Sequence, residues 1–341
     1  MPETLSTRPI FVTGTAGFIG FHLAKRLLED GHRVVGIDNL NSYYDVALKE
    51  DRLKILDGYD GHRTVRADLA DRAAVDAIFA EDNPEYVINL AAQAGVRHSL
   101  KAPRDYIEAN IAGFLNILEG CRNGDVKHLL YASSSSVYGG NEKMPFSVSD
   151  NVDHPKSLYA ASKKANELMA HSYSSLYDIP TSGLRFFTVY GPWGRPDMAM
   201  YLFMKAMKDG EPLNVFNNGD MYRDFTFVDD IVESIVRLIP QPAAPDPDFD
   251  AKNPDPAGSW APYKVYNIGN SRKERLMDVI DLLQKHAGIE AKLNMMPMQP
   301  GDVSATWADT AALEKVTGFT PNTSIDEGIA AFVRWYEEYY G

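Results

Sequence analysis

The feature that most constrains the fold is a glycine-rich turn near the N-terminus, Gly14-Thr15-Ala16-Gly17-Phe18-Ile19-Gly20. An apolar run over residues 10–12 precedes it and is typical of a buried strand, while a helical apolar pattern follows from Phe18. Glycine adopts the left-handed backbone of a tight turn at no steric cost, and the free N–H groups of a helix start can bind a diphosphate. The spacing has one residue more than the usual G-x-G-x-x-G, so the turn alone also fits a flexible loop.

A carboxylate downstream strengthens this interpretation. A second expected strand, 33–38, ends in Asp38 about twenty residues after the turn, where a carboxylate accepts the ribose hydroxyls of a dinucleotide. The same charge repels a 2′-phosphate, and Asn39 rather than a cation follows it. The pattern therefore predicts NAD, not NADP, as the cofactor.

Composition excludes several other classes. The 341 residues suffice for two domains, and the net charge of −13 argues against electrostatic binding of nucleic acid. Cys121 is the single cysteine, so neither an intrachain disulfide nor a thiolate metal cluster can form, and we expect no metal. We find no secretory signal and no apolar run of membrane-spanning length, so we expect a cytoplasmic protein that does not associate with membranes.

Strand and helix patterns alternate along the first half of the chain. After the first two strands, further strands are expected at 63–68, 85–92, 128–133 and 181–187, with helices at 73–79, after Pro103 and at 158–177. Repeated βα units predict an α/β fold, a Rossmann-type doubly wound parallel sheet with ligands at the carboxyl ends of its strands.

The alternation breaks after residue 187, which predicts a smaller α/β C-terminal substrate-binding lobe. Its expected elements and the last parts of the sheet domain are helices at 198–207, 229–238, 277–286 and 325–339 and strands at 224–228 and 263–268. We assign 1–187 and about 225–268 to the NAD-binding domain, and about 188–224 and 269–341 to the other domain. Residues 240–262, rich in Pro, Asp and Ala, are expected to form an exposed insertion loop.

Two groups of polar residues carry candidate chemistry. Tyr159 and Lys163 are four residues apart and share a helix face, where an ammonium lowers the pKa of a phenol and makes it a general base. Tyr201 and Lys205 have the same spacing without supporting context, and we interpret them as ordinary helix residues. Residues 133–136 are four serines at an expected strand end, which favours contact with a substrate over a merely solvated loop.

These motifs resemble the extended short-chain dehydrogenase/reductase family, and within it the nucleotide-sugar epimerases, over almost the whole chain. The matching residues are Thr13-Gly14-x-x-Gly17-x-x-Gly20, Asp38, Asp68-Leu69, Asn89-Leu90-Ala91-Ala92, residues 133–139, Tyr159-x-x-x-Lys163 and Arg223-Asp224-Phe225. Residues 92–97 and 194–199 are most similar to the UDP-glucuronate 4-epimerases.

The resemblance implies a reaction and a set of site residues. The reaction is reversible conversion of UDP-glucuronate to UDP-galacturonate through a transient 4-keto sugar, with tightly bound NAD. The implied catalytic residues are Tyr159, Lys163 and Ser134. The implied cofactor-binding residues are Gly14, Gly17, Phe18, Ile19, Gly20, Asp38, Asn39, Asp68, Leu69, Leu90, Ala91, Ala92, Gln93, Asn110, Ser133, Tyr159, Lys163 and Phe186. The implied substrate-binding residues are Arg97, Ser134, Ser135, Ser136, Tyr159, Thr188, Arg195, Val215, Phe216, Arg223 and Asp302.

Related activities remain as alternatives. A UDP-glucose/UDP-galactose 4-epimerase would use the same residues, although such enzymes carry Asn where this chain has Thr188. A decarboxylase or dehydratase of the family carries Glu where Ser136 stands, and a non-catalytic NAD-sensing protein would be expected to lose the tyrosine–lysine pair. Resemblance also implies a homodimer formed through the helices spanning 104–120 and 158–177.

Overall fold

The centre of the molecule is a seven-stranded, fully parallel sheet. The computed structural model describes residues 5–298 and 304–341. Across the sheet the strands are β11 (Tyr263–Ile268), β6 (Thr181–Phe186), β5 (His128–Ser134), β4 (Tyr86–Asn89), β1 (Ile10–Thr13), β2 (Val34–Asp38) and β3 (His62–Arg66). Every residue of β1 and of β6 is buried, as expected for strands that are covered on both faces. This confirms the predicted fold class.

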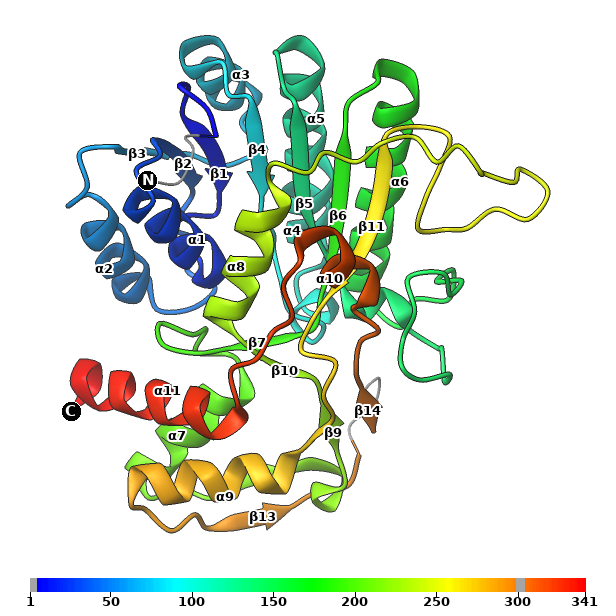
Figure 1. Ribbon diagram of the computed structural model, residues 1–341. Coiled ribbons are helices and arrows are strands. Elements are labelled where there is room, and N and C mark those ends of the chain that lie inside the picture. The colour runs from blue at the N-terminus through cyan, green and yellow to red at the C-terminus, as the bar shows by residue number, and fades with distance from the viewer. Residues whose placement is uncertain (1–4, 299–303) are drawn as a thin grey trace.

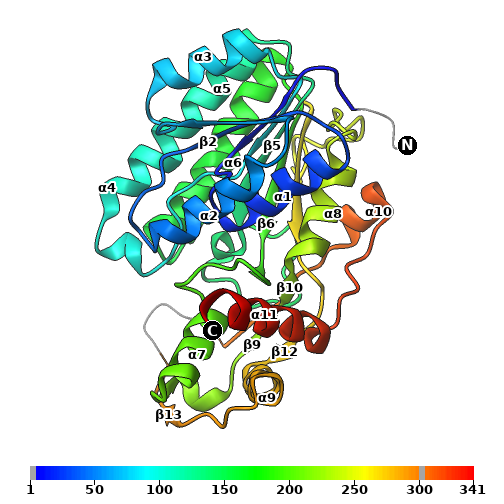
Figure 2. The same ribbon diagram turned by 90° about the vertical axis from the view of Figure 1, so that its left-hand side faces the viewer.

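Helices cover both faces of the sheet (Figures 1 and 2). On one face α1 (Phe18–Glu29) packs against α8 (Val228–Leu238), with Phe21 and Ile235 in a shared core. On the other face lie α3 (Arg72–Asp82), α5 (Gly113–Asn123) and α6 (Leu158–Tyr177). Their core includes Phe79 and Phe114. Burial on both sides holds the strand ends rigidly in place.

The strand order creates a crevice for ligands. β1 lies between β2 and β4, so the chain leaves β1 in one direction and later returns to its other side. In open α/β sheets, ligands bind outside the carboxyl ends of the strands at this switch point. The glycine turn follows β1 there, and the serine-rich stretch follows β5.

A second core lies below the sheet in Figure 1. Its members include Phe203, Ile280 and Phe332. The elements of this part are β7 (Thr188–Tyr190), α7 (Ala199–Asp209), β8 (Leu213–Val215), β9 (Tyr222–Arg223), β10 (Phe225–Phe227), β12 (Glu274–Arg275), α9 (Leu276–Ala287), β13 (Leu293–Met295), β14 (Ala305–Thr306) and α11 (Ile325–Tyr340). Between β14 and α11 the chain returns to the sheet, where α10 (Ala311–Thr317) packs on α8 and β11.

Two helical features differ from the sequence expectations. α2 (Val46–Leu56) was not expected, because Lys49 and Arg52 occupy its buried face and hide the apolar period. The stretch after Pro103 is not one continuous α-helix but α4 (Pro103–Tyr106), the π-helix η2 (Ile107–Ala112) and α5. A π-helical turn frees backbone carbonyls for other partners, which matters at the site below.

The loop of residues 240–262 extends away from the body on the right of Figure 1, but it is not exposed throughout. Ala257, Ser259 and Ala261 are buried, and Ser259 Oγ lies 2.7 Å from His171 Nε2 on α6. The expectation of a simple exposed insertion was therefore wrong for the last part of the loop. Among the described helices, none combines the length and the apolar character needed to cross a membrane.

Candidate active site

The glycine turn forms a bare-backbone cradle between β1 and α1. Gly14 has a φ of +76°, and a Cβ there would lie 3.0 Å from the backbone of Ala91. A Cβ on Gly20 would lie 2.1 Å from the carbonyl oxygen of Gly14, so α1 can approach the turn only with glycine there. Gly17 N donates to the same oxygen at 2.9 Å. The first turn of α1, with Phe18 and Ile19, therefore presents its free N–H groups beside Ala91.

Asp38 lies at the carboxyl end of β2, next to this cradle. Its two oxygens accept N–H groups of Ala16 at 3.0 Å and Leu40 at 2.9 Å, and each keeps a further lone pair for a ribose hydroxyl. Burial raises the pKa of Asp38. Lys49 is close, but its Nζ donates to the carbonyl oxygen of Asn41 at 2.6 Å. These contacts favour a 2′-hydroxyl at this position.

A polar cleft of about 420 Å³ opens beside Asp38. Asn39, Asp68 and Gln93 contribute to its lining, and Asn39 Nδ2 donates to Asp68 Oδ2 at 2.6 Å. Leu69 is buried, and Leu90 to Ala92 continue from the end of β4. Three of the predicted cofactor-binding residues, Asn39, Asp68 and Gln93, thus line one polar space.

Asn110 connects the cofactor side to the helix of Tyr159. Its Nδ2 donates to Gln93 O at 3.0 Å and to Ser162 Oγ at 2.9 Å, and that hydroxyl donates to Tyr159 O at 2.8 Å. Asn110 lies in η2, and its own carbonyl accepts Asn166 Nδ2 at 2.6 Å. The π-helical turn therefore supplies the backbone acceptor that ties η2 to α6.

Tyr159, Lys163 and Ser134 meet at the end of β5. Ser134 is within hydrogen-bonding reach of the Tyr159 phenol and also accepts Ser136 Oγ at 2.9 Å. Lys163 is buried, and its Nζ donates to Ala132 O at 2.8 Å. The ring of Tyr106 packs edge-on against Tyr159 with centroids 6.0 Å apart. This arrangement can hold a hydroxyl of a ligand between a phenol and a serine.

The protonation states differ from the sequence expectation. Burial raises the pKa of Tyr159, while the Ser134 hydrogen bond and the charge of Arg195 act in the opposite direction. Burial lowers the pKa of Lys163 to about 8. The prediction that Lys163 brings the phenol pKa below its usual value is wrong for the protein alone, because desolvation outweighs the nearby charges.

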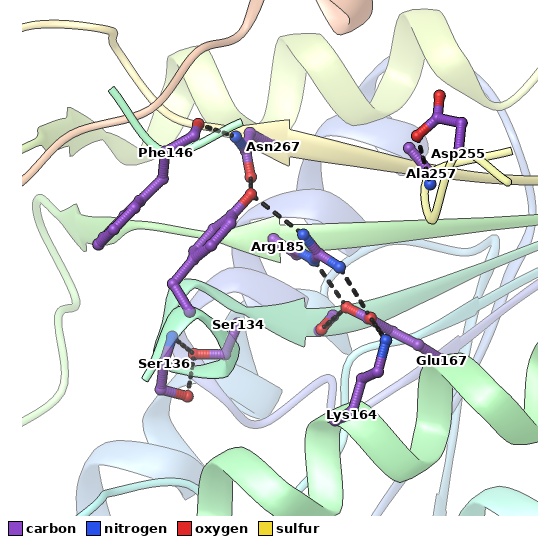
Figure 3. A network of polar contacts seen from close by, with 11 residues as sticks. Ser134, Ser136, Phe146, Lys164, Glu167, Arg185, Asp255, Ala257 and Asn267 are labelled. Atoms are coloured by element: carbon purple, nitrogen blue, oxygen red, sulfur yellow. Dashed lines mark hydrogen bonds and ion pairs between the residues drawn. The ribbon is translucent and has the colours of Figure 1, made fainter. Parts of the chain in front are cut away.

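A buried polar network fixes the serine-rich strand end (Figure 3). Arg185 on β6 donates from Nε and Nη2 to the two oxygens of Glu167 on α6, at 2.9 and 3.0 Å. Ser133 Oγ donates to Glu167 at 2.6 Å, so this hydroxyl is directed into the core, away from a ligand. Phe186, adjacent to Arg185, is also buried. The network therefore aligns β5, β6 and α6 beneath Ser134 and Ser136.

On the substrate side, Thr188 and Arg195 line one small cavity together with Phe18. Arg195 donates to Asp197 through Nε and Nη2, at 3.0 and 2.6 Å. Half-buried Ser135 and Ser136 form the start of the 3₁₀ helix η3 (Ser135–Tyr138). An arginine and several hydroxyls thus lie where the chain passes from the sheet into the second core.

The predicted residues for the nucleotide half are spread more widely. The guanidinium of Arg97 lies 5.6 Å from the ring centroid of half-buried Phe216, so these two predicted residues meet. The Val215 side chain is fully buried in the second core, which gives it a packing role. Arg223 Nη1 donates to Tyr222 O at 2.8 Å and contacts Ser304 O. Asp302 lies outside the described residues.

In the segment between β2 and the end of α2, sequence reasoning named only Asn39 and missed the residues that follow it. Tyr43, Tyr44, Lys49 and Arg52 all contact residues near the predicted binding regions. Two cations lie over the ring of Tyr44: Lys49 Nζ is 4.4 Å and the guanidinium carbon of Arg52 is 5.7 Å from the ring centroid. The paired tyrosines and the i, i+3 cations are the signal that could have pointed to this segment.

The fold and the site together define a dinucleotide-binding Rossmann protein with a glycine turn after β1 and a tyrosine–lysine pair on α6, at the end of β5. The residues fit NAD, because Gly14 and Gly20 leave backbone bare where a Cβ would collide, and Asp38 is available to a ribose. Within the described residues, no group of three His, Cys, Asp or Glu side chains could hold a metal ion.

The chain belongs to the NAD dependent epimerase/dehydratase family, whose sequence profile matches residues 10–269. It is 50% identical to a probable UDP-glucuronate 4-epimerase of Rhizobium meliloti (strain 1021), over 96% of this chain and 97% of that protein. It is 42% identical to UDP-glucuronate 4-epimerase 1 of Arabidopsis thaliana, over 97% of this chain and 77% of that one. A crystal structure of UDP-glucuronic acid 4-epimerase from Bacillus cereus, in complex with UDP-glucuronic acid and NAD, matches with a TM-score of 0.84. That structure is 31% identical and covers 97% of this chain and 100% of its own.

Proposed function

We propose that this protein is an isomerase that interconverts UDP-glucuronate and UDP-galacturonate by inverting the configuration at C4, with NAD as its bound cofactor. The observation that carries the proposal is the meeting of Tyr159 with Ser134 at the end of β5, two strands from β1 and its glycine turn, where the charge of Arg195 also acts on the phenol. The similarity to UDP-glucuronate 4-epimerases supports the choice of substrate.

The proposed proton transfers use Tyr159 and Ser134, whose side chains meet at the end of β5. Tyr159 takes the proton of the sugar 4-hydroxyl, and Ser134 holds the same oxygen. NAD, when bound, supplies the means to remove and return a hydride at C4. The sugar turns between the two transfers and presents its other face, and Tyr159 returns the proton. Lys163 contributes its charge and keeps α6 fixed to the carbonyl of Ala132.

The carboxylate of the substrate must be held while the sugar is a 4-ketone. Such a ketone is a β-keto acid and loses carbon dioxide when the breaking bond aligns with the carbonyl. We assign this holding role to the hydroxyls of Ser135, Ser136 and Thr188. Two positions support the assignment: Thr188 lines the cavity that Arg195 also lines, and Ser135 and Ser136 follow directly after Ser134 at the end of β5. The lack of a Glu at position 136 for elimination chemistry supports it as well.

The chain offers a matched pair of variants for the central residue. Tyr159→Phe should lower the turnover of UDP-glucuronate by at least about a thousandfold, because the proton acceptor is lost. Tyr201→Phe removes a hydroxyl from the other Tyr-x-x-x-Lys sequence, on α7, and should retain activity close to that of the unchanged protein. Product formation is followed by NMR. Full activity of the Tyr159→Phe variant would contradict the proposal.

We also propose that the protein forms a homodimer and acts in the cytoplasm. We further propose that the chain is divided into the two domains whose bounds are given in the sequence analysis. α5 and α6 pack side by side, and their outer surfaces carry exposed apolar side chains that include Leu115, Leu168 and Leu176. A second copy of the chain packed on these helices would remove this apolar surface from water.

A further inference from the structure

The segment of residues 40–52 lies between the two proposed binding regions, and the mechanism above gives it no task. It begins two residues after Asp38 and includes the first part of α2. We propose that Tyr43 and Arg52 are positioning residues for Arg195, and that through them the adenosine side of the cofactor site supports the substrate site. The proposal rests on the proposed function, because it takes Arg195 as a residue that binds anionic groups of the substrate.

Arg52 connects the cofactor cradle to the loop that carries Arg195. Its side chain is fully buried. Nη1 donates to Ala16 O, within the glycine turn, at 2.7 Å. Nη2 donates to Trp193 O at 2.6 Å and to Gly194 O at 3.3 Å. A single guanidinium therefore fixes the cradle and the two residues before Arg195 relative to each other.

The partners of Arg52 are neutral groups. Among the described residues, its Nε has no hydrogen-bond partner, and the Asp38 carboxylate interacts with its charge without a direct hydrogen bond. The remaining contact of Nη1 is the Tyr44 hydroxyl at 2.9 Å. Burying a charge without a direct ion pair costs free energy, and an apolar side chain would avoid this cost. In return, Arg52 contributes directed hydrogen bonds to three carbonyl groups, those of Ala16, Trp193 and Gly194.

The loop held by Arg52 has a strained backbone. Trp193 has a φ of +57°, in the left-handed region, which is unfavourable for a bulky residue. Its ring contacts Phe21 on α1 and Trp335 on α11, so it touches both cores. His22 Nε2 lies 2.9 Å from Pro192 O. Contacts from both parts of the molecule therefore keep the residues before Arg195 in one conformation.

Tyr43 acts on the side chain of Arg195 through Asp197. The Tyr43 hydroxyl donates to Asp197 Oδ2 at 3.0 Å, and Asp197 holds Arg195 by two hydrogen bonds. Lys49 in turn holds Asn41, through its carbonyl oxygen at 2.6 Å and its Oδ1 at 2.8 Å. The segment that follows the ribose-binding carboxylate thus fixes both the backbone before Arg195 and the direction of its guanidinium.

The test uses two variants and two matched controls in the full-length protein. Tyr43→Phe removes one hydroxyl, and its control Tyr59→Phe removes a hydroxyl that bonds Glu29 on the surface. Arg52→Lys shortens the buried cation, and its control Arg66→Lys changes an exposed residue paired with Glu50. Each protein is assayed for kcat and KM with UDP-glucuronate, for the dissociation constant of UDP-glucuronate by calorimetry, and for NAD retained after purification.

We expect Tyr43→Phe to raise KM and the dissociation constant about tenfold and to change kcat less than about threefold, because a hydrogen bond to a charged group is lost from a binding residue. Arg52→Lys should do the same to a larger extent and also retain less NAD. The double variant should be less impaired than the product of the two single effects, since both act through Arg195.

The outcomes separate this proposal from the proposed function. A normally active protein in which Tyr43→Phe matches Tyr59→Phe in KM and affinity overturns the positioning role alone. If Arg52→Lys does not fold, Tyr43→Phe still decides the matter. A protein that neither binds nor converts UDP-glucuronate overturns both proposals.

Discussion

At the scale of single residues, burial decides the chemistry of the site more than residue identity does. Tyr159 and Lys163 could be named from their spacing, but their protonation could not, because desolvation raises the pKa of the phenol and lowers that of the ammonium to about 8. A phenol with a raised pKa depends on neighbouring positive charge to act as a base. Arg195 supplies part of that charge, so the direction in which its guanidinium points affects the pKa of Tyr159 and thereby the reaction.

Thr188 provides the residue-scale prediction. Thr188→Val keeps the shape of the side chain and removes the hydroxyl assigned to the substrate carboxylate. We expect kcat/KM for UDP-glucuronate to fall roughly 10- to 150-fold, the cost of one hydrogen bond to a charged group, and keto-sugar or pentose by-products to increase. Thr181→Val is the control, because the buried Thr181 hydroxyl on β6 has no hydrogen-bond partner among the residues that the structure describes. Unchanged rate and unchanged leakage of by-products would remove Thr188 from the account.

At the scale of elements, the sheet and its helices could be predicted well because their patterns are long or fully apolar. The parallel strands are buried runs, and α6 was expected with the bounds that it has. β8, β12 and β13 could not be predicted, since two or three residues show no period. α2 escaped detection because Lys49 and Arg52 replace the apolar residues of its inner face.

The same limits apply to the site. Residues in contiguous motifs, such as Gly14, Asp38 and Tyr159, could be predicted because each motif carries its own local geometry. Arg52 could not, because its partners Ala16 and Trp193 lie far away in the sequence. The inward direction of the Ser133 hydroxyl follows from Glu167 on another element. Long-range packing, which no local pattern encodes, determines these roles.

The glycine turn gives the element-scale prediction. Gly20→Ala introduces a Cβ that would lie 2.1 Å from the Gly14 carbonyl oxygen, so α1 must move away from the turn. We expect the purified variant to lose bound NAD and to lose activity by at least about a hundredfold, while the sheet still folds. Gly140→Ala meets only His154, at ordinary contact distances, and serves as the control. Absorbance and enzymatic assay of released NAD measure retention; normal retention by Gly20→Ala would count against the cradle.

At the scale of the whole molecule, the two cores meet where the reaction is proposed to occur. The sheet with α1 and α6 forms the upper part of the molecule in Figure 2, and α7, α9 and α11 form the lower part. Trp193 packs against the cores of both parts. Arg52 joins the same two parts by hydrogen bonds. Alignment of the two binding regions is therefore a property of the assembled chain.

The proposed dimer is testable at this scale. Leu168 on α6 is 59% exposed, and Leu168→Glu would place a charge in the proposed interface. We expect the variant to elute and scatter light as a monomer, with the unchanged protein a dimer. Leu202→Glu alters an exposed leucine on α7, away from these helices, and should leave the assembly unaffected. A monomeric unchanged protein, or a dimer that tolerates Leu168→Glu, would exclude this interface.

The most direct test of the central claim is to incubate the purified protein with UDP-glucuronate, with and without added NAD, and to resolve the products by NMR. The account predicts UDP-galacturonate in a reversible mixture that forms from either epimer, without release of carbon dioxide and without a requirement for added NAD. A UDP-pentose with carbon dioxide would make the protein a decarboxylase. Conversion of UDP-glucose to UDP-galactose without turnover of UDP-glucuronate would contradict the roles given to Thr188 and the serines.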